Sequence, residues 1–313
     1  MPNLHDIERR IKSVESTKQI THTMQMVAAA KIRHSTERVE AATPYGEAVK
    51  EMLANIARMG GTTAPLATAH DEVKKTLIVV IASDRGLAGG FNSSVLRRAE
   101  QIMKERKAEG KEVAVAACGK KAIGYFKYRG IDTVLAFRDL SADPRVEEAD
   151  ALADYAMEHY LSGEIDEVVV LYNHAKNAGE QVLIQQPLLP VNPKAFLPKG
   201  EVFVKGGGIT EPTPDNPDLP GAIDYEPSEE DVLDHFLPEY IAGHFYYMLI
   251  DSAAAEQAAR RNAMKNATDN ANDMIETLNR VYNRVRQGAI TTEINEIVGG
   301  AAALEYRWPC CRR

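Results

Sequence analysis

Apolar residues recur at helical spacing over two long stretches at opposite ends of the chain. Neither residues 3–43 nor residues 244–287 contain glycine or proline. Typical globular helices run to roughly 20 residues, and longer uninterrupted patterns indicate coiled coils, membrane spans or helical repeats. Both stretches carry many charges, including Arg9, Lys12 and Arg261, which excludes a membrane span. The pattern therefore predicts two long helices that pair as a shaft, with an ordinary all-α bundle as the alternative.

The stretch near the C-terminus has the clearest pairing pattern. Its apolar residues keep three-four spacing for three heptads, which is typical of a left-handed coiled coil. These expected seam residues are Met264, Ala267, Ala271, Met274, Leu278, Val281 and Val285. Near the N-terminus the same rhythm holds from Leu4 to Val14, after which Lys18 and Thr21 fall on the seam. We therefore expect the apolar stripe to shift there to Ile20, Met24 and Val27.

Between these stretches, short apolar runs alternate with helical patterns. The expected strands are Thr76–Ala82, Glu112–Gly119, Thr133–Phe137, Glu167–Tyr172 and Gln181–Gln186, and the expected helices are Asn92–Arg106, Lys120–Arg129 and Pro144–Leu161. This alternation favours a Rossmann-like α/β domain with a mainly parallel sheet. The following stretch, residues 193–227, holds seven prolines, five glycines and six acidic residues. It therefore reads as a surface insertion.

A glycine-containing loop, DRGLAGG at residues 84–90, joins the first expected strand to the first central helix. The dinucleotide fingerprint requires GxGxxG and the Walker loop requires GxxxxGK followed by Ser or Thr, and neither spacing is present. We assign Gly86, Gly89 and Gly90 to a structural turn, where glycine tolerates positive φ. The competing interpretation is a nucleotide-dependent α/β enzyme whose long helices only dimerise it.

Charge and chemistry narrow the function further. The net charge of −8 is uneven, because residues 1–58 and 240–313 are slightly basic while the middle of the chain carries 19 basic against 30 acidic residues. Concentrated basic charge, the footprint of a nucleic-acid partner, is missing. No metal-binding cluster, nucleophile elbow or other catalytic constellation stands out, and three cysteines form no disulfide framework. We therefore expect no catalytic, cofactor or metal site, and no direct membrane insertion.

Four segments in order carry a family resemblance. They are ITHTMQMVAAAK at residues 20–31, DRGLAGG, EQAARRNAMKNATDNA at 256–271 and ITTEINEIVGGAAA at 290–303. Together they resemble the gamma subunit of F-type rotary ATP synthases, and the likeness covers nearly the whole chain. Within the last segment Ile290, Thr291, Glu293, Glu296, Gly300 and Ala301 fit the family signature at its spacing.

The resemblance implies both a fold and a function. The terminal helices would form an antiparallel coiled coil inside a hexamer of alpha and beta subunits, and the α/β domain would lie beside the epsilon subunit and the membrane ring of c subunits. The chain would transmit torque between ion flow and ATP synthesis, without catalysing a reaction itself, at the cytoplasmic face of the cell membrane. The residues implied to contact other subunits are Met24, Arg260, Arg286, Gln287, Thr291 and Glu293.

The chain departs from the family pattern at three places. Ala88 stands where many members have cysteine, the insertion is longer than the family core requires, and the tail with Cys310 and Cys311 continues past the usual end. The expected division is an N-terminal shaft helix at 1–58, an α/β domain at 73–191, the insertion at 192–227, a C-terminal shaft helix at 228–304 and an extension at 305–313. Nothing in the tail matches the family, so we expect it to be dispensable.

Overall fold

The computed structural model describes residues 4–58, 64–140, 144–177, 180–192, 195 and 229–305. The chain divides into two compact units, one made of residues 28–262 and one made of residues 1–27 together with 263–313. Each unit is described by itself. Nearly all of the expected insertion and the cysteine-containing tail lie outside the described residues.

The unit of residues 28–262 is built on a five-stranded sheet in the order β3-β2-β1-β4-β5. The strands are β1 (Lys75–Ile81), β2 (Glu112–Cys118), β3 (Leu135–Phe137), β4 (Glu167–Ala175) and β5 (Gln181–Leu189). Strands β1 to β4 run parallel, while β5 pairs antiparallel with β4. The expected α/β domain is confirmed, and each strand begins within two residues of its expected start.

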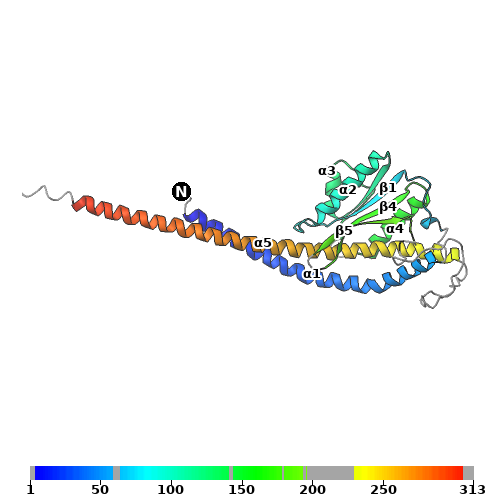
Figure 1. Ribbon diagram of the computed structural model, residues 1–313, viewed down its shortest axis with the longest axis horizontal. Coiled ribbons are helices and arrows are strands. Elements are labelled where there is room, and N and C mark those ends of the chain that lie inside the picture. Colours follow the sequence, from blue (N-terminus) through cyan, green and yellow to red (C-terminus); the bar gives the residue numbers. More distant parts are fainter. Residues whose placement is uncertain are drawn as a thin grey trace, which may run out of the picture. The chain divides into compact units, whose positions relative to one another are not determined.

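Helices cover both faces of this sheet (Figure 1). On one face lie α2 (Phe91–Ala108) and α3 (Lys120–Tyr128), whose apolar side chains pack against alternate residues of the central strands, such as Ile78, Val80 and Val115. On the other face lies α4 (Val146–Leu161), packed against the intervening residues Leu77 and Val79. Strands buried on both faces explain why their sequences are continuous apolar runs.

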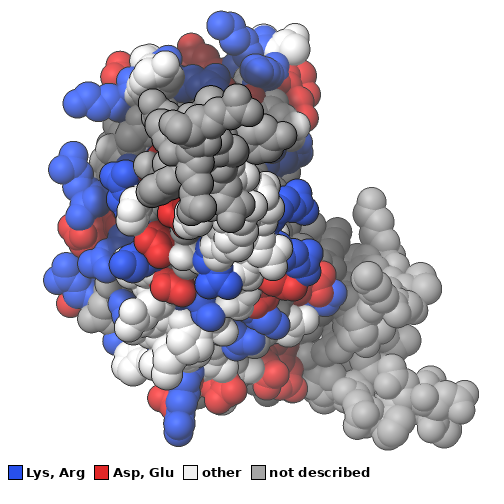
Figure 2. Space-filling view, turned by 90° about the vertical axis from the view of Figure 1, so that its left-hand side faces the viewer, with Lys and Arg blue, Asp and Glu red and all other residues white. Residues whose placement is uncertain are grey.

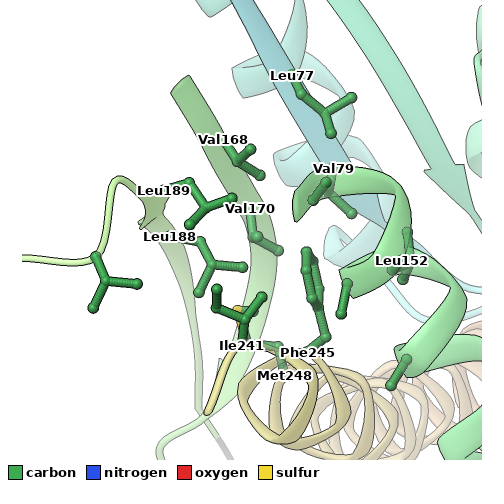
Figure 3. Packing of buried hydrophobic residues seen from close by; sticks show 14 of the residues in the cluster. Leu77, Val79, Leu152, Val168, Val170, Leu188, Leu189, Ile241, Phe245 and Met248 are labelled. Carbon is green, nitrogen blue, oxygen red and sulfur yellow. The ribbon is translucent and has the colours of Figure 1, made fainter. Parts of the chain in front are cut away.

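The two long helices complete the layer that α4 begins. They are α1 (Leu4–Arg58) and α5 (Glu229–Glu305), of 55 and 77 residues. Val49 and Leu53 of α1 are buried in the same core as the apolar row of α5, which consists of Leu233, Leu237, Ile241, Phe245, Met248 and Leu249. Figure 3 shows Ile241, Phe245 and Met248 pointing toward β4, β5 and α4. The supposed shaft is therefore also part of the α/β core.

Both helices continue well past the stretches without proline and glycine. Pro44 lies inside α1 and Pro238 inside α5. A proline removes one helical hydrogen bond and usually kinks or ends a helix. Here the apolar rows on the C-terminal side of each proline are buried in the core, and this packing outweighs the lost bond.

In the other unit, the first residues of α1 pair antiparallel with α5. The Tyr282 hydroxyl donates a hydrogen bond to Glu8 at 3.2 Å, and the hydroxyl oxygens of Thr21 and Thr268 lie 2.8 Å apart. Moving from residue 8 to residue 21 of α1 therefore moves the partner from residue 282 back to residue 268 of α5. The antiparallel coiled coil implied by the family resemblance is confirmed.

The seam of this coiled coil differs from the expected one. Met264, Ala267, Ala271, Leu278 and Val285 are buried or half-buried as expected. Met274 is 54% exposed and Val281 36% exposed, and their places are taken by Ile275 and Tyr282. Thr268 is buried next to the half-buried Ala267. The prediction of Met274 and Val281 was wrong because two rows with three-four spacing pass through Ala271, Leu278 and Val285. The two rows differ at the positions between these residues. Side-chain hydrogen bonds to α1 select the row that contains Thr268 and Tyr282.

The expected shift of the stripe in α1 is wrong at Ile20 and Val27, whereas Met24 is half-buried. Ile20 is 60% exposed and Val27 52% exposed, whereas Thr21 is buried. The heptad that starts at Leu4 is interrupted at the exposed Lys18 and is buried again at Thr21, whose hydroxyl has a partner across the seam. Ile20 and Val27 therefore form part of the outer surface of this unit.

Candidate functional site

The loop between β1 and α2 is closed by its own polar side chains. Ser83 is fully buried, and its backbone N–H donates to the Asn92 side-chain oxygen at 2.9 Å. The Asn92 amide donates back to the Ser83 hydroxyl at 2.8 Å. The carboxylate of Asp84 accepts hydrogen bonds from the N–H groups of Lys120 and Asp139, at 2.9 and 3.0 Å. Two N–H groups that could bind an anion at this sheet edge are thus occupied by a carboxylate of the chain.

The glycines of the loop do not all have the backbone role expected of them. Gly89 has φ of 58°, which is in the left-handed region that favours glycine. Gly86 and Gly90 do not have positive φ, and the second left-handed residue is Leu87 with φ of 64°. A bulky residue in this region is uncommon. The expectation of positive φ therefore holds at Gly89 alone among the three.

Helix α5 lies against the end of this loop. Ala88 and Phe91 pack with Ala255 and Ala259 of α5 in a small apolar cluster. All residues from Ile250 to Arg260 are buried, around the whole circumference of the helix. A helix that is buried on every side lies inside the protein and is not exposed to solvent.

A buried carboxylate fastens α5 to the end of β4. The carboxylate of Asp251 lies 2.7 Å from Nδ1 of His174 and accepts a hydrogen bond from the N–H of Ala175 at 3.1 Å. Burial raises the pKa of Asp251, although these two hydrogen bonds act in the opposite direction. A buried carboxylate with two such partners fixes the position of α5 along the strand end.

These contacts occupy the place where a doubly wound sheet binds nucleotides. Ligands of such sheets lie outside the carboxyl ends of the strands, at the point where the strand order reverses. Here that point lies between β1 and β4, and α5 covers the loop after β1 and the end of β4 through Ala255, Ala259 and Asp251. The crevice required by the alternative enzyme interpretation is therefore filled by the chain itself.

Arg260 belongs to the same region and is buried, with only 9% of its surface exposed. Its guanidinium group pairs with Glu256, donates to Gln257 at 3.0 Å and reaches the Gly86 carbonyl oxygen at 3.4 Å. In this chain Arg260 therefore joins α5 to the DRGLAGG loop. Met24, in the other unit, is half-buried beside the coiled-coil seam.

The remaining candidate contact residues lie together at the end of α5. Arg286, Gln287, Thr291 and Glu293 are exposed, and the Thr291 hydroxyl donates to the Gln287 carbonyl oxygen at 2.9 Å within the helix. All residues from 286 to 303 are exposed. The pairing with α1 places Leu4 near residue 286, so this end of α5 extends past the first described residue of α1.

The same end exposes a row of large apolar side chains that sequence reasoning did not single out as contacts. Ile290, Ile294, Ile297 and Val298 are exposed by 48%, 54%, 71% and 61%. Their spacing of four, three and one residues places them on one face of the helix. The signal in the sequence was the continuation of helical apolar spacing past the end of the paired seam. A row of this kind, on a helix end that has no partner among the described residues, is a candidate interaction surface.

Neither charge nor metal ligands indicate a functional site within the described part of the chain. Basic and acidic side chains are intermixed on the face that Figure 2 shows. The described residues contain no group of three His, Cys, Asp or Glu side chains that could hold a metal ion. None of the described helices has a stretch sufficiently long and apolar to cross a membrane.

Comparisons with known proteins all lead to ATP synthases. A family model described as ATP synthase matches residues 3–304. The ATP synthase gamma chain of Chlorobium phaeobacteroides (strain BS1) is 39% identical over 312 residues, covering 97% of this chain and 99% of that protein.

Two solved structures are also similar. The central stalk and c-ring structure of Tetrahymena thermophila mitochondrial ATP synthase contains a chain with a TM-score of 0.55 and 27% identity, covering 79% of this chain and 99% of its own. A chain of the Euglena gracilis mitochondrial ATP synthase shares the fold, with a TM-score of 0.66 at 19% identity and coverage of 99% and 97%.

Proposed function

The chain belongs to the ATP synthase family, and its similar relatives are ATP synthase gamma chains. From this premise we propose that it is the central rotor shaft of an F-type ATP synthase. In this role it transmits torque between a membrane ring driven by ion flow and a catalytic hexamer of alpha and beta subunits. Rotation of its asymmetric surface changes the binding state of each beta subunit in turn.

The observation that carries the proposal is the continuity of α5. This helix of 77 residues has a contour length of about 115 Å at 1.5 Å per residue. Its first part, from Leu233 to Leu249, is built into the core of the α/β domain. Its last part is exposed and carries an apolar row. One unbroken helix therefore connects a firmly packed domain to a surface that has no partner among the described residues.

We assign the two regions to different partners. The exposed end of α5 enters the hexamer, where Met24, Arg286, Gln287, Thr291 and Glu293 contact alpha and beta subunits. Arg260 is left out of this set because its guanidinium group is engaged within the chain. The α/β domain lies beside the epsilon subunit and the ring of c subunits, in line with the Tetrahymena structure of a central stalk and c-ring.

As a gamma chain, the protein is a subunit of the ATP synthase complex. Within that complex we assign it no catalytic step, because the crevice that would bind a nucleotide is filled by α5. It is held at the cytoplasmic face of the cell membrane by its partners. In functional terms, residues 1–58 and 228–304 are the shaft, residues 73–191 the α/β domain, and residues 192–227 and 305–313 an insertion and an extension.

The proposal is tested by Ile297→Asp in a chain reconstituted with alpha, beta and the remaining subunits in proton-pumping vesicles. Ile297 is 71% exposed, so the isolated chain should unfold at the wild-type temperature. Inside the hexamer the new carboxylate would be desolvated without a partner. We therefore expect assembly or ATP synthesis to fall severalfold.

Tyr128→Asp provides the matched control, because Tyr128 is 90% exposed at the end of α3 in the α/β domain. This variant should assemble and synthesise ATP at the wild-type rate. Equal rates for Ile297→Asp and Tyr128→Asp would show that the end of α5 does not enter a binding surface, and the proposed role would then be rejected.

A further inference from the structure

A gap opens between α1 and α5 in the unit of residues 28–262, where a glycine replaces a core side chain. Ala42, Gly46, Val49 and Leu53 follow three-four spacing on the buried side of α1. Val49 and Leu53 fill the space against α5, but Gly46 has no side chain, and a Cβ atom placed there would meet no atom within 4 Å. Opposite, Gly243 of α5 lies against the ring of Tyr45, with 3.2 Å between its would-be Cβ and that ring.

The gap is a cavity of about 300 Å³. Its walls come from residues 42–50 of α1 and residues 240–247 of α5, and they include the rings of Tyr45, Tyr240, Tyr246, Tyr247 and His244. Small-molecule sites are of this kind, with volumes from about 300 Å³ upward, aromatic walls and few polar groups. The charged groups that line the cavity are Lys50 and Glu47, which offset each other.

His244 lines this cavity and has a buried ring nitrogen that lacks a partner among the described residues. Its Nε2 is buried and has no hydrogen-bond partner among the described residues. The imidazole stacks with Tyr240 at a centroid distance of 5.4 Å and with Tyr247 at 6.3 Å. Burial, assisted by the charge of Lys50, lowers the pKa of His244 to about 4, so the ring is neutral near pH 7. A buried polar atom without a partner costs free energy that a ligand can recover.

We propose that this cavity binds an uncharged planar aromatic molecule carrying a hydroxyl group, with its ring among the tyrosines and its hydroxyl bonded to Nε2 of His244. A hydroxyl suits either tautomer of the imidazole, because it can donate to a bare ring nitrogen and accept from a protonated one. Flat rings suit walls made of tyrosine and histidine rings, because offset stacking is favourable. A bicyclic phenol fits a cavity of this size, since a cavity of about 150 Å³ already holds benzene.

The test uses 2-naphthol as the probe and 2-methylnaphthalene, which has the same shape without a hydroxyl, as its match. Binding to the full-length chain is measured by ligand-observed NMR with titration. We expect saturable binding of both compounds at one site, with 2-naphthol the tighter. In His244→Phe, the affinity for 2-naphthol should fall by about fivefold, the value of one neutral hydrogen bond, while that of 2-methylnaphthalene changes little.

Substitutions at Gly46 separate occupation of the cavity from general surface binding. Gly46→Leu places a side chain in the open space and should abolish saturable binding of both compounds, whereas Gly46→Ala should retain it. Gly124→Leu is the control, because Gly124 is a helical glycine of α3 that is exposed and equally free of neighbours. Circular dichroism verifies that each variant is folded.

Three outcomes would overturn the proposal. The first is the absence of saturable binding to the wild-type chain. The second is unchanged binding in a folded Gly46→Leu variant. The third is an equal loss of both compounds in His244→Phe, which would leave the imidazole without a hydrogen-bonding role.

Discussion

Phe245 provides the sharpest test of how α5 is fixed to the α/β domain. Its side chain is fully buried and points between β4 and α4, close to Val170 and Leu152 (Figure 3). Replacing it with alanine removes the aromatic ring and leaves a cavity, because the surrounding strands and helices cannot close the space. Phe→Ala substitutions in cores cost about 3–5 kcal/mol. That cost is a large part of the roughly 5–15 kcal/mol by which a typical protein is stable.

The prediction is measured by urea unfolding of the purified chain, followed by circular dichroism, together with hydrogen exchange of the β4 amides. Phe245→Ala should lower the free energy of unfolding by about 3–5 kcal/mol and accelerate exchange in β4. Leu161→Ala is the control, because Leu161 is 57% exposed at the end of α4, and it should change stability by less than about 0.5 kcal/mol. A loss below about 1 kcal/mol for Phe245→Ala would refute the inference that α5 forms a layer of the domain core.

Two further predictions concern the coiled coil and the pH dependence of stability. Leu278→Asp should destabilise the paired helices, as judged by melting temperature, while Met274→Asp, on the exposed face, should not; similar losses would restore the seam expected from the sequence. Burial alone would raise the pKa of Asp166, but hydrogen bonds from His70 and from two backbone N–H groups outweigh burial and lower it below the usual value of 3.8. Because the folded-state pKa is depressed, Asp166 stabilises the fold above the unfolded-state value, and this contribution is lost as the pH falls through the folded-state pKa. Asp166→Asn should therefore lower stability at pH 7 and flatten its decline in acid, and an unchanged acid limb would contradict the assignment.

The coiled-coil seam shows what the spacing of apolar residues can and cannot predict. Three-four spacing correctly predicted that Met264, Ala267, Ala271, Leu278 and Val285 are buried or half-buried. The same spacing allows two rows through Ala271, Leu278 and Val285, and apolar character alone favoured the wrong one. The correct row contains Thr268, which became identifiable only through its hydroxyl partner on the opposite helix.

The candidate contact residues show the same difference between what the sequence predicts and what tertiary packing decides. The family resemblance assigned contact roles to Arg286, Gln287, Thr291 and Glu293, and they lie together near the end of α5 on an exposed helix. Arg260 belongs to an equally recognisable segment, yet its side chain turns toward the DRGLAGG loop. A residue number on a helix does not determine which neighbour its side chain meets, because that depends on what packs against the helix.

The sequence by itself determined the elements. Continuous apolar runs, alternating helical patterns and two long periodic ends were sufficient for the order of strands and helices and for the α/β class, because these features depend on local spacing and on burial of one face. Tertiary structure alone decided that α1 and α5 form one layer of the domain core, and that α5 fills the crevice at the end of β1 and β4. These outcomes depend on contacts between residues far apart in the sequence, such as Phe91 with Ala255 and Ala175 with Asp251, which no local period encodes.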